Sequence, residues 1–116
     1  MSARFVILHH TGYGDEHWDL MLEAGESLWT WQLAADPTSG LAKPISARRI
    51  GHHRKLYLDY EGPVSGGRGH VRRVDRGTFD LISQAPIEIV LQLHGRRWSG
   101  TARLRQREAN WILERI

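Results

Sequence analysis

A period-two alternation of apolar and polar residues is the feature that most restricts how this chain can fold. In HWDLMLE, residues 17–23, Trp18, Leu20 and Leu22 occupy one set of alternate positions, and three polar residues with Met21 occupy the other. Successive side chains of a β-strand point to opposite faces, so this pattern predicts a half-buried strand. No segment shows a sustained helical period, and the chain is therefore predicted to be mainly all-β.

Similar short segments recur between turn residues, which is typical of an antiparallel β-barrel or sandwich. We predict a compact antiparallel barrel of about eight strands, with a long loop or short helix near residues 35–52. The predicted strands are RFVILHH (4–10), HWDLMLE (17–23), SLWTWQL (27–33) and RKLYLDYEG (54–62), then segments within 66–77, 78–84, 87–95, 99–108 and 110–116.

The composition restricts the class of protein. A chain of 116 residues fits a single domain, residues 1–116. It has no cysteine, which excludes disulfides and thiolate metal ligands, and no apolar run long enough to span a bilayer or act as a signal peptide. We therefore expect a cytoplasmic protein.

The net charge is +3, with most basic residues from Lys43 onward. This distribution fits either a solvated surface or a surface that binds nucleic acid.

Three residues near the N-terminus form a candidate metal site. His17 and Asp19 lie two positions apart on a predicted strand, so their side chains leave the same face. His10 ends the preceding strand and reaches them if TGYGDE turns back as a loop. Two imidazoles and a carboxylate suit Mn²⁺, Fe²⁺ or Zn²⁺. Alternation favours His10 over His9, which stays an alternative ligand; a polar strand face without metal is the other interpretation.

A second group of polar residues follows about forty positions later. His53, Lys55 and Tyr57 alternate onto one face of the predicted strand 54–62, where the imidazole and the phenol can contact one phosphate. The alternative is a loop histidine and an ordinary barrel tyrosine. Arg68, in a glycine-rich turn, is placed to meet an anion. A stripe of Arg103, Arg105 and Arg107 is either a phosphate track or a solubilising surface.

The order of these motifs resembles a known family, the 3′-phosphoesterase domain of bacterial DNA ligase D and its stand-alone relatives. That family has a histidine, a short loop and His-Tyr-Asp-x-Arg-Leu-Glu; this chain has His10, a loop and HWDLMLE (17–23). Its His-Pro-x-x-Tyr-x-x-Phe-Glu-Gly motif is similar to HRKLYLDYEG (53–62). VRRVDRGTF (71–79) and the closing LQLHG, SGTARL and NWILE segments also follow the family pattern.

The resemblance implies a metal-dependent phosphoesterase of nucleic-acid end repair, which removes a 3′-phosphate or a 3′-ribonucleotide from DNA or RNA ends. The implied cofactor is a divalent metal, Mn²⁺ first, with Zn²⁺ or Co²⁺ as alternatives. No ligase or polymerase motif accompanies the domain, so a separate DNA ligase or polymerase is the implied partner in trans. The implied site residues are the metal ligands His10, His17 and Asp19, the catalytic phosphate-contacting pair His53 and Tyr57, and the phosphate-binding or nucleic-acid-binding Arg54, Lys55 and Arg68.

One departure from the family pattern affects the expected activity. The family's arginine two residues after the motif aspartate is Met21 here, which carries no charge and no hydrogen-bond donor. Losing a charge-assisted phosphate contact costs about 1.5–3 kcal/mol. This departure leaves open one alternative function, a non-catalytic module that binds nucleic-acid ends. A second alternative is a cupin-like metalloenzyme acting on a small molecule, because Gly12, His17, Asp19 and Glu23 loosely mimic the first motif of that family.

Overall fold

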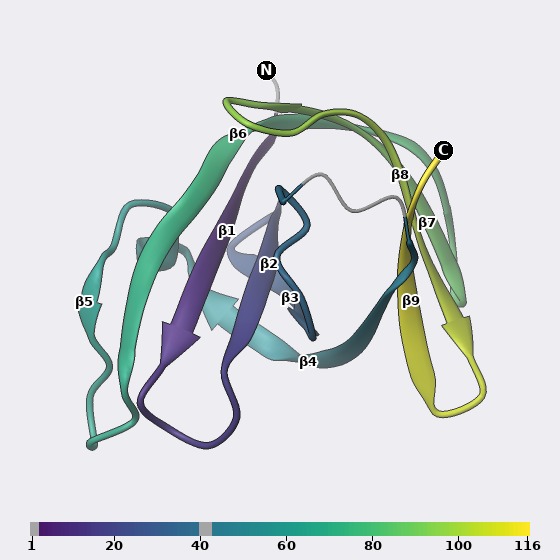
Figure 1. The fold of residues 1–116 in the computed structure, drawn as a ribbon. Helices are drawn as coiled ribbons and strands as arrows, with labels where there is room; N and C mark the ends of the chain where they lie inside the picture. Colours follow the sequence, from purple (N-terminus) through teal and green to yellow (C-terminus); the bar gives the residue numbers. More distant parts are fainter. Residues whose placement is uncertain (1–2, 40–42) are drawn as a thin grey trace.

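The chain forms a barrel of antiparallel strands (Figure 1), seen in a computed structural model that describes residues 3–39 and 43–116. The elements in chain order are β1 (Ala3–Thr11), β2 (His17–Ala24), β3 (Ser27–Leu33), β4 (Ile45–Arg54), the 3₁₀-helix η1 (Lys55–Leu58), β5 (Gly62–Pro63), β6 (His70–Ala85), β7 (Glu88–Gly95), β8 (Ser99–Arg107) and β9 (Asn110–Arg115).

The sheet closes on itself. Its strand order is β1-β2-β3-β4-β9-β8-β7-β6, and β1 also pairs with β6, so eight strands make a closed antiparallel barrel. The short β5 pairs with β6 from outside the barrel. Closure gives the backbone groups of both end strands a partner. The predicted all-β barrel is confirmed. None of the helices in the described part of the chain is long and apolar enough to cross a membrane.

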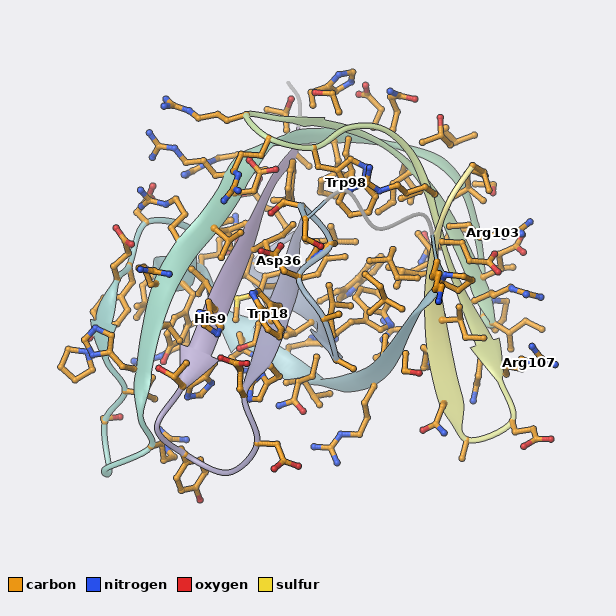
Figure 2. All side chains as sticks on the ribbon, viewed as in Figure 1. His9, Trp18, Asp36, Trp98, Arg103 and Arg107 are labelled. Carbon is orange, nitrogen blue, oxygen red and sulfur yellow. The ribbon has the colours of Figure 1, made fainter. Side chains whose placement is uncertain are left out.

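Apolar side chains fill the inside of the barrel (Figure 2). The alternation seen in the sequence produces this core, because Leu20 and Leu22 of β2 point inward and are completely buried. Trp31 of β3 lies edge to face against Trp111 of β9, with ring centroids 5.7 Å apart. Burying side chains of this size contributes about 1.5–3 kcal/mol each, so the interior supplies the main stabilisation of the fold.

A second apolar cluster lies on the outer face of β1, β2, β3 and β6. It is covered by η1, whose Leu58 packs against the strands, with Tyr57, Tyr60 and Val64 at its margin. This outer cluster consists of Val6, Leu8, Met21, Leu28, Leu58 and Val71. It holds η1 against the barrel and so brings the segment after β4 close to the ends of β1 and β2.

Two predicted elements are wrong. The loop predicted at 35–52 ends early, because β4 begins at Ile45; its stretch 40–42 lies outside the described residues. Ile45 and Ala47 are buried while Ser46 and Arg48 are exposed, so a strand alternation is present, but small and polar residues obscure it. β3 and β9 supply the pairing that makes the segment extended.

The strand predicted at 54–62 is also wrong. β4 ends at Arg54, and residues 55–58 form η1 instead. A period-two pattern is a weak signal over so few residues, and here packing of Leu58 onto the outer cluster overrides it.

The segments predicted at 66–77 and 78–84 merge into the single long strand β6. Gly77 lies inside that strand. A Cβ atom at Gly77 would lie 2.0 Å from the carbonyl oxygen of His94, so only glycine permits this close approach to β7.

Candidate metal and phosphate site

Three polar side chains meet on the outer face of the barrel, where β1 ends and β2 begins. His10 of β1 is the direct cross-strand partner of His17 of β2, and Leu8 pairs with Asp19. Directly paired residues share a face, so His10, His17 and Asp19 point the same way. One donor atom from each of the three lies within 4.8 Å of the others.

The carboxylate of Asp19 lies between the two imidazoles. His17 Nδ1 donates to Asp19 Oδ1 at 2.8 Å, and His10 Nδ1 lies 3.6 Å from Asp19 Oδ2. Asp19 is only 3% exposed, and a carboxylate so far from water needs compensating partners. His17 provides one of them through this hydrogen bond.

A backbone carbonyl orients His10. Its Nε2 donates to the carbonyl oxygen of Arg68 at 2.6 Å, so in the neutral ring Nδ1 is an acceptor facing another acceptor, Asp19 Oδ2. The glycine-rich turn can approach because Gly69 has φ +83° and no side chain; a Cβ there would lie 2.1 Å from the oxygen of Thr11. His10 Nδ1 and Asp19 Oδ2 therefore point lone pairs toward each other, beside the imidazole of His17. Together these groups form a set of metal ligands that fits a divalent cation.

His9 points away from this group. Its ring stacks on Trp18, with centroids 4.6 Å apart and planes 7° apart, and its Nε2 lies 2.7 Å from Glu16 Oε2 (Figure 2). Of the two adjacent histidines, the structure therefore brings His10, as the alternation favoured, to His17 and Asp19.

His53 and Tyr57 lie together, although not on one strand. His53 is near the end of β4 and Tyr57 is in η1, and their rings meet edge to face with centroids 5.8 Å apart. His53 Nδ1 donates to the carbonyl oxygen of Gly51 at 3.1 Å, which leaves Nε2 available to a ligand. The turn into η1 thus brings together two side chains that were predicted to meet by strand alternation.

One cavity of about 220 Å³ joins both groups. His10, His17 and Asp19 line it together with His53 and Tyr57, and Arg68 and Met21 also contribute. Met21 is 1% exposed and belongs to the outer apolar cluster. Position 21, where the family resemblance led us to expect an arginine, is therefore an apolar part of the cavity wall.

The basic residues named from the sequence lie in different surroundings. Lys55 pairs with Glu23 at 3.1 Å, and the Arg68 guanidinium donates to the carbonyl oxygen of Ser65 at 2.8 Å. Arg54 is exposed and, like Lys55, is not among the residues that line this cavity. Of the three, the structure places Arg68 at the site.

The arginine stripe lies on β8, away from His9 and Trp18 in Figure 2. Arg103 donates to Glu114 at 2.7 Å and Arg105 at 3.0 Å. The hydrogen bonds from Arg103 hold the pKa of Glu114 below its usual 4.5 and raise that of Arg103. Arg103 and Arg105 thus form ion pairs with Glu114 of the neighbouring strand β9.

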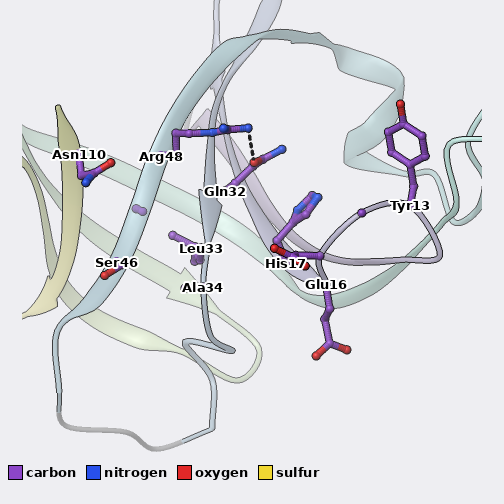
Figure 3. A pocket seen from close by; sticks show the side chains of 12 residues that line it. Tyr13, Glu16, His17, Gln32, Leu33, Ala34, Ser46, Arg48 and Asn110 are labelled. Atoms are coloured by element: carbon purple, nitrogen blue, oxygen red, sulfur yellow. Dashed lines mark hydrogen bonds between the residues drawn. The ribbon is translucent and has the colours of Figure 1, made fainter.

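Sequence reasoning missed two polar residues, Gln32, which lines the cavity, and Arg48, which lies beside it. They line a neighbouring groove of about 530 Å³ (Figure 3), where Arg48 donates to Gln32 Oε1 at 3.1 Å. The signal was hidden because Arg48 fell in the stretch assigned to a loop.

The cupin-like alternative needs Glu23 as a further ligand. Glu23 instead accepts the backbone N–H of Arg4 at 3.0 Å and pairs with Lys55. Among the described residues, the ligand cluster contains His10, His17 and Asp19 and does not include Glu23.

Comparison with known proteins agrees with this geometry. Residues 8–106 match the family model of the DNA Ligase D 3'-phosphoesterase domain, a family that processes nucleic-acid 3′ ends. No curated protein matches the chain. The family match spans both polar groups and most of the barrel, as the order of the sequence motifs implied. The chain therefore belongs to the DNA ligase D 3′-phosphoesterase domain family.

Proposed function

We propose that this protein is a metal-dependent phosphoesterase that removes a 3′-phosphate or a 3′-ribonucleotide from DNA or RNA during end repair. The observation that carries the proposal is a single cavity with a two-histidine, one-carboxylate cluster on one wall and His53 with Tyr57 on another. Both the donor set and the phosphate-contacting pair suit phosphoester hydrolysis.

His10, His17 and Asp19 would hold the cation, for which Mn²⁺ is the first choice, with Zn²⁺ or Co²⁺ as alternatives. A divalent cation bound there supplies Lewis-acid polarisation of a phosphoryl oxygen. The Arg68 carbonyl keeps the His10 ring in one orientation, and Asp19 does the same for His17.

His53 and Tyr57 act on the phosphoryl group itself. With Nδ1 bound to the Gly51 carbonyl, a protonated His53 directs Nε2–H toward a phosphoryl oxygen, and the Tyr57 hydroxyl is a second donor. Donors held in place before the reaction stabilise the negative charge that develops in the transition state. The reaction leaves a 3′-hydroxyl. A separate DNA polymerase can extend this end, or a separate DNA ligase can seal it.

The direct test is release of a 3′-phosphate from a primer–template in the presence of Mn²⁺. We expect release by the unchanged protein, loss in His17→Ala, and retention in His94→Ala, whose imidazole pairs with exposed Asp80 elsewhere on the barrel. Absence of activity with Mn²⁺, Zn²⁺ and Co²⁺ would refute the catalytic proposal. Activity that survives His17→Ala would refute the ligand assignment.

Met21 supports a second candidate, an end-binding module without turnover. The buried methionine removes a cation from the cavity wall while the rest of the site is retained. This candidate expects salt-sensitive binding of DNA ends with no phosphate release, and binding that tolerates Asp19→Ala. The same primer–template experiment, with binding measured beside hydrolysis, separates the two functions.

A further inference from the structure

A row of three polar side chains crosses the outer face of the barrel next to the cavity. Asp19 of β2 pairs directly with Gln32 of β3, and Gln32 pairs directly with Arg48 of β4. Direct partners point to the same face, so all three side chains leave the barrel on the side of the cavity. Arg48 lies two strand spacings from Asp19, about 10 Å at Cα.

Arg48 is available to bind an anion. One of its guanidinium nitrogens donates to Gln32 Oε1 at 3.1 Å, its side chain is exposed, and no carboxylate of the described residues pairs with it. A guanidinium has five N–H donors in a planar fork, so most of them remain for a phosphate. Gln32 accepts without adding charge, so this contact orients the arginine without neutralising it; Asp15 and Glu16 also line the groove.

The groove of Arg48 continues from the cavity. Tyr13, His17 and Gln32 line both spaces, so a strand whose terminal phosphate occupies the cavity can extend directly past Arg48. Figure 3 shows the order along the groove, from Tyr13 and His17 through Gln32 and Arg48 to Asn110. Tyr13 is 57% exposed at the shared rim, and exposed aromatic rings are surfaces on which nucleic-acid bases stack.

We infer that this groove is a subsite for the phosphodiester that precedes the 3′-terminal phosphate, with Arg48 as its cation and Gln32 as the residue that positions it. The inference rests on the proposed function and narrows its substrate class to oligonucleotide 3′ ends, because a nucleoside 3′-monophosphate has no second phosphate for Arg48. Arg48 would thus hold the substrate at the phosphate next to the cavity, and it does not replace a cation at the position of Met21.

The first experiment measures binding of a fluorescent single-stranded oligonucleotide with a 3′-hydroxyl, which resembles the product and is not consumed. We expect Arg48→Met to weaken binding about tenfold or more, the usual loss for one charge-assisted contact. The slope of log affinity against log salt should fall by about 0.7, the value for one phosphate contact on a single strand. Arg48→Lys should keep most of the slope while losing part of the affinity.

The matched control is Arg97→Met. Arg97 is also an exposed arginine, but it lies in the turn between β7 and β8, and its side chain lines neither space. Its affinity and salt slope should equal those of the unchanged protein. Equal losses in Arg48→Met and Arg97→Met, no loss in Arg48→Met, or no binding by the unchanged protein would each overturn the inference.

Gln32 has its own test, because its role is to position Arg48. Gln32→Ala should weaken oligonucleotide binding modestly, whereas Gln32→Glu should weaken it more, since a carboxylate would neutralise the arginine. A residue with a purely structural role would give losses that follow the change in thermal stability. Stronger binding in Gln32→Glu than in Gln32→Ala would refute the positioning role.

A second measurement separates this inference from the proposed function. With Mn²⁺, kcat/KM is compared for a 3′-phosphorylated oligonucleotide and for a nucleoside 3′-monophosphate. Arg48→Met should lower the ratio of the first to the second, and an unchanged ratio would refute the subsite. If neither compound is hydrolysed by any variant, the phosphoesterase proposal fails, while the binding results still decide whether Arg48 holds a phosphodiester.

Discussion

His10 on β1 and His17 on β2 are direct cross-strand partners whose rings lie edge to face, with centroids 4.7 Å apart. The loop between β1 and β2 reverses the direction of the chain. The last residues of β1 therefore lie opposite the first residues of β2. The carboxylate of Asp19 lies beside both rings, and the three side chains present their donor atoms to one point.

Asp19→Asn should weaken Mn²⁺ binding by at least about tenfold, since it removes the negative charge of the cluster and leaves only a weaker, neutral acceptor to orient His17. Isothermal titration or Mn²⁺ electron paramagnetic resonance measures the change. Asp80→Asn is the control, because Asp80 also bonds a histidine, His94 at 2.9 Å, but lies outside the cavity. Equal Mn²⁺ affinity in Asp19→Asn and the unchanged protein would contradict the ligand role of Asp19.

Met21→Arg should raise kcat/KM for a 3′-phosphorylated oligonucleotide about tenfold or more, because it adds a charge-assisted phosphate contact of about 1.5–3 kcal/mol. It should also lower the free energy of unfolding by about 1–3 kcal/mol, since position 21 belongs to the outer apolar cluster. Steady-state kinetics and urea denaturation measure the two effects.

Met21→Leu is the control for that experiment, because the two side chains have similar volumes. It should lower the free energy of unfolding by less than about 1.5 kcal/mol. Its kcat/KM, calculated per folded molecule, should equal that of the unchanged protein. If Met21→Arg folds and its kcat/KM is no higher than that of Met21→Leu, the lack of a cation at position 21 does not limit the activity.

Asp75→Asn should destabilise the barrel by about 3 kcal/mol or more. The buried carboxylate accepts four backbone N–H groups, from Arg76, Arg96, Arg97 and Trp98, at 2.8–3.0 Å, and so joins β6 to the turn between β7 and β8. The asparagine amide would replace one acceptor oxygen with an NH₂ group. This donor would face a backbone N–H, which is also a donor, and the hydrogen bond would be lost. Urea denaturation measures the loss, and a value within 0.5 kcal/mol of the exposed control Asp80→Asn would contradict this role.

Glu23 should make the stability pH-dependent in acid. The backbone N–H of Arg4, and secondarily Lys55, hold the pKa of Glu23 below its usual 4.5. A lowered pKa in the folded state stabilises the protein above pH 4.5, and this contribution is lost as the pH falls through the folded value. Thermal unfolding followed from pH 6 to pH 3 should show a steeper loss in the unchanged protein than in Glu23→Gln.

Glu26→Gln is the matched control for the acid experiment, because Glu26 is exposed in the turn that follows the same strand. It should retain the steep loss. Parallel curves for Glu23→Gln and the unchanged protein would show that this carboxylate does not couple folding to protonation.

Much of the fold could be predicted from local patterns. The strands at 17–23 and 27–33, their inward and outward faces, and the placement of His17 with Asp19 follow from an alternation that a closed barrel preserves. The order of motifs also identified the family, since His10, HWDLMLE and HRKLYLDYEG keep their relative positions in the chain.

Contacts between distant segments decided the remainder. β4 is extended because β3 and β9 pair with it, and residues 55–58 form η1 because Leu58 packs on the outer cluster. The same contacts place Tyr57 beside His53, the Arg68 carbonyl at His10, and Arg48 in line with Gln32 and Asp19. A pattern of residues reports which face of a strand is buried; which strand becomes its neighbour, and therefore which side chains meet in one site, depends on barrel closure and on packing between residues far apart in the chain.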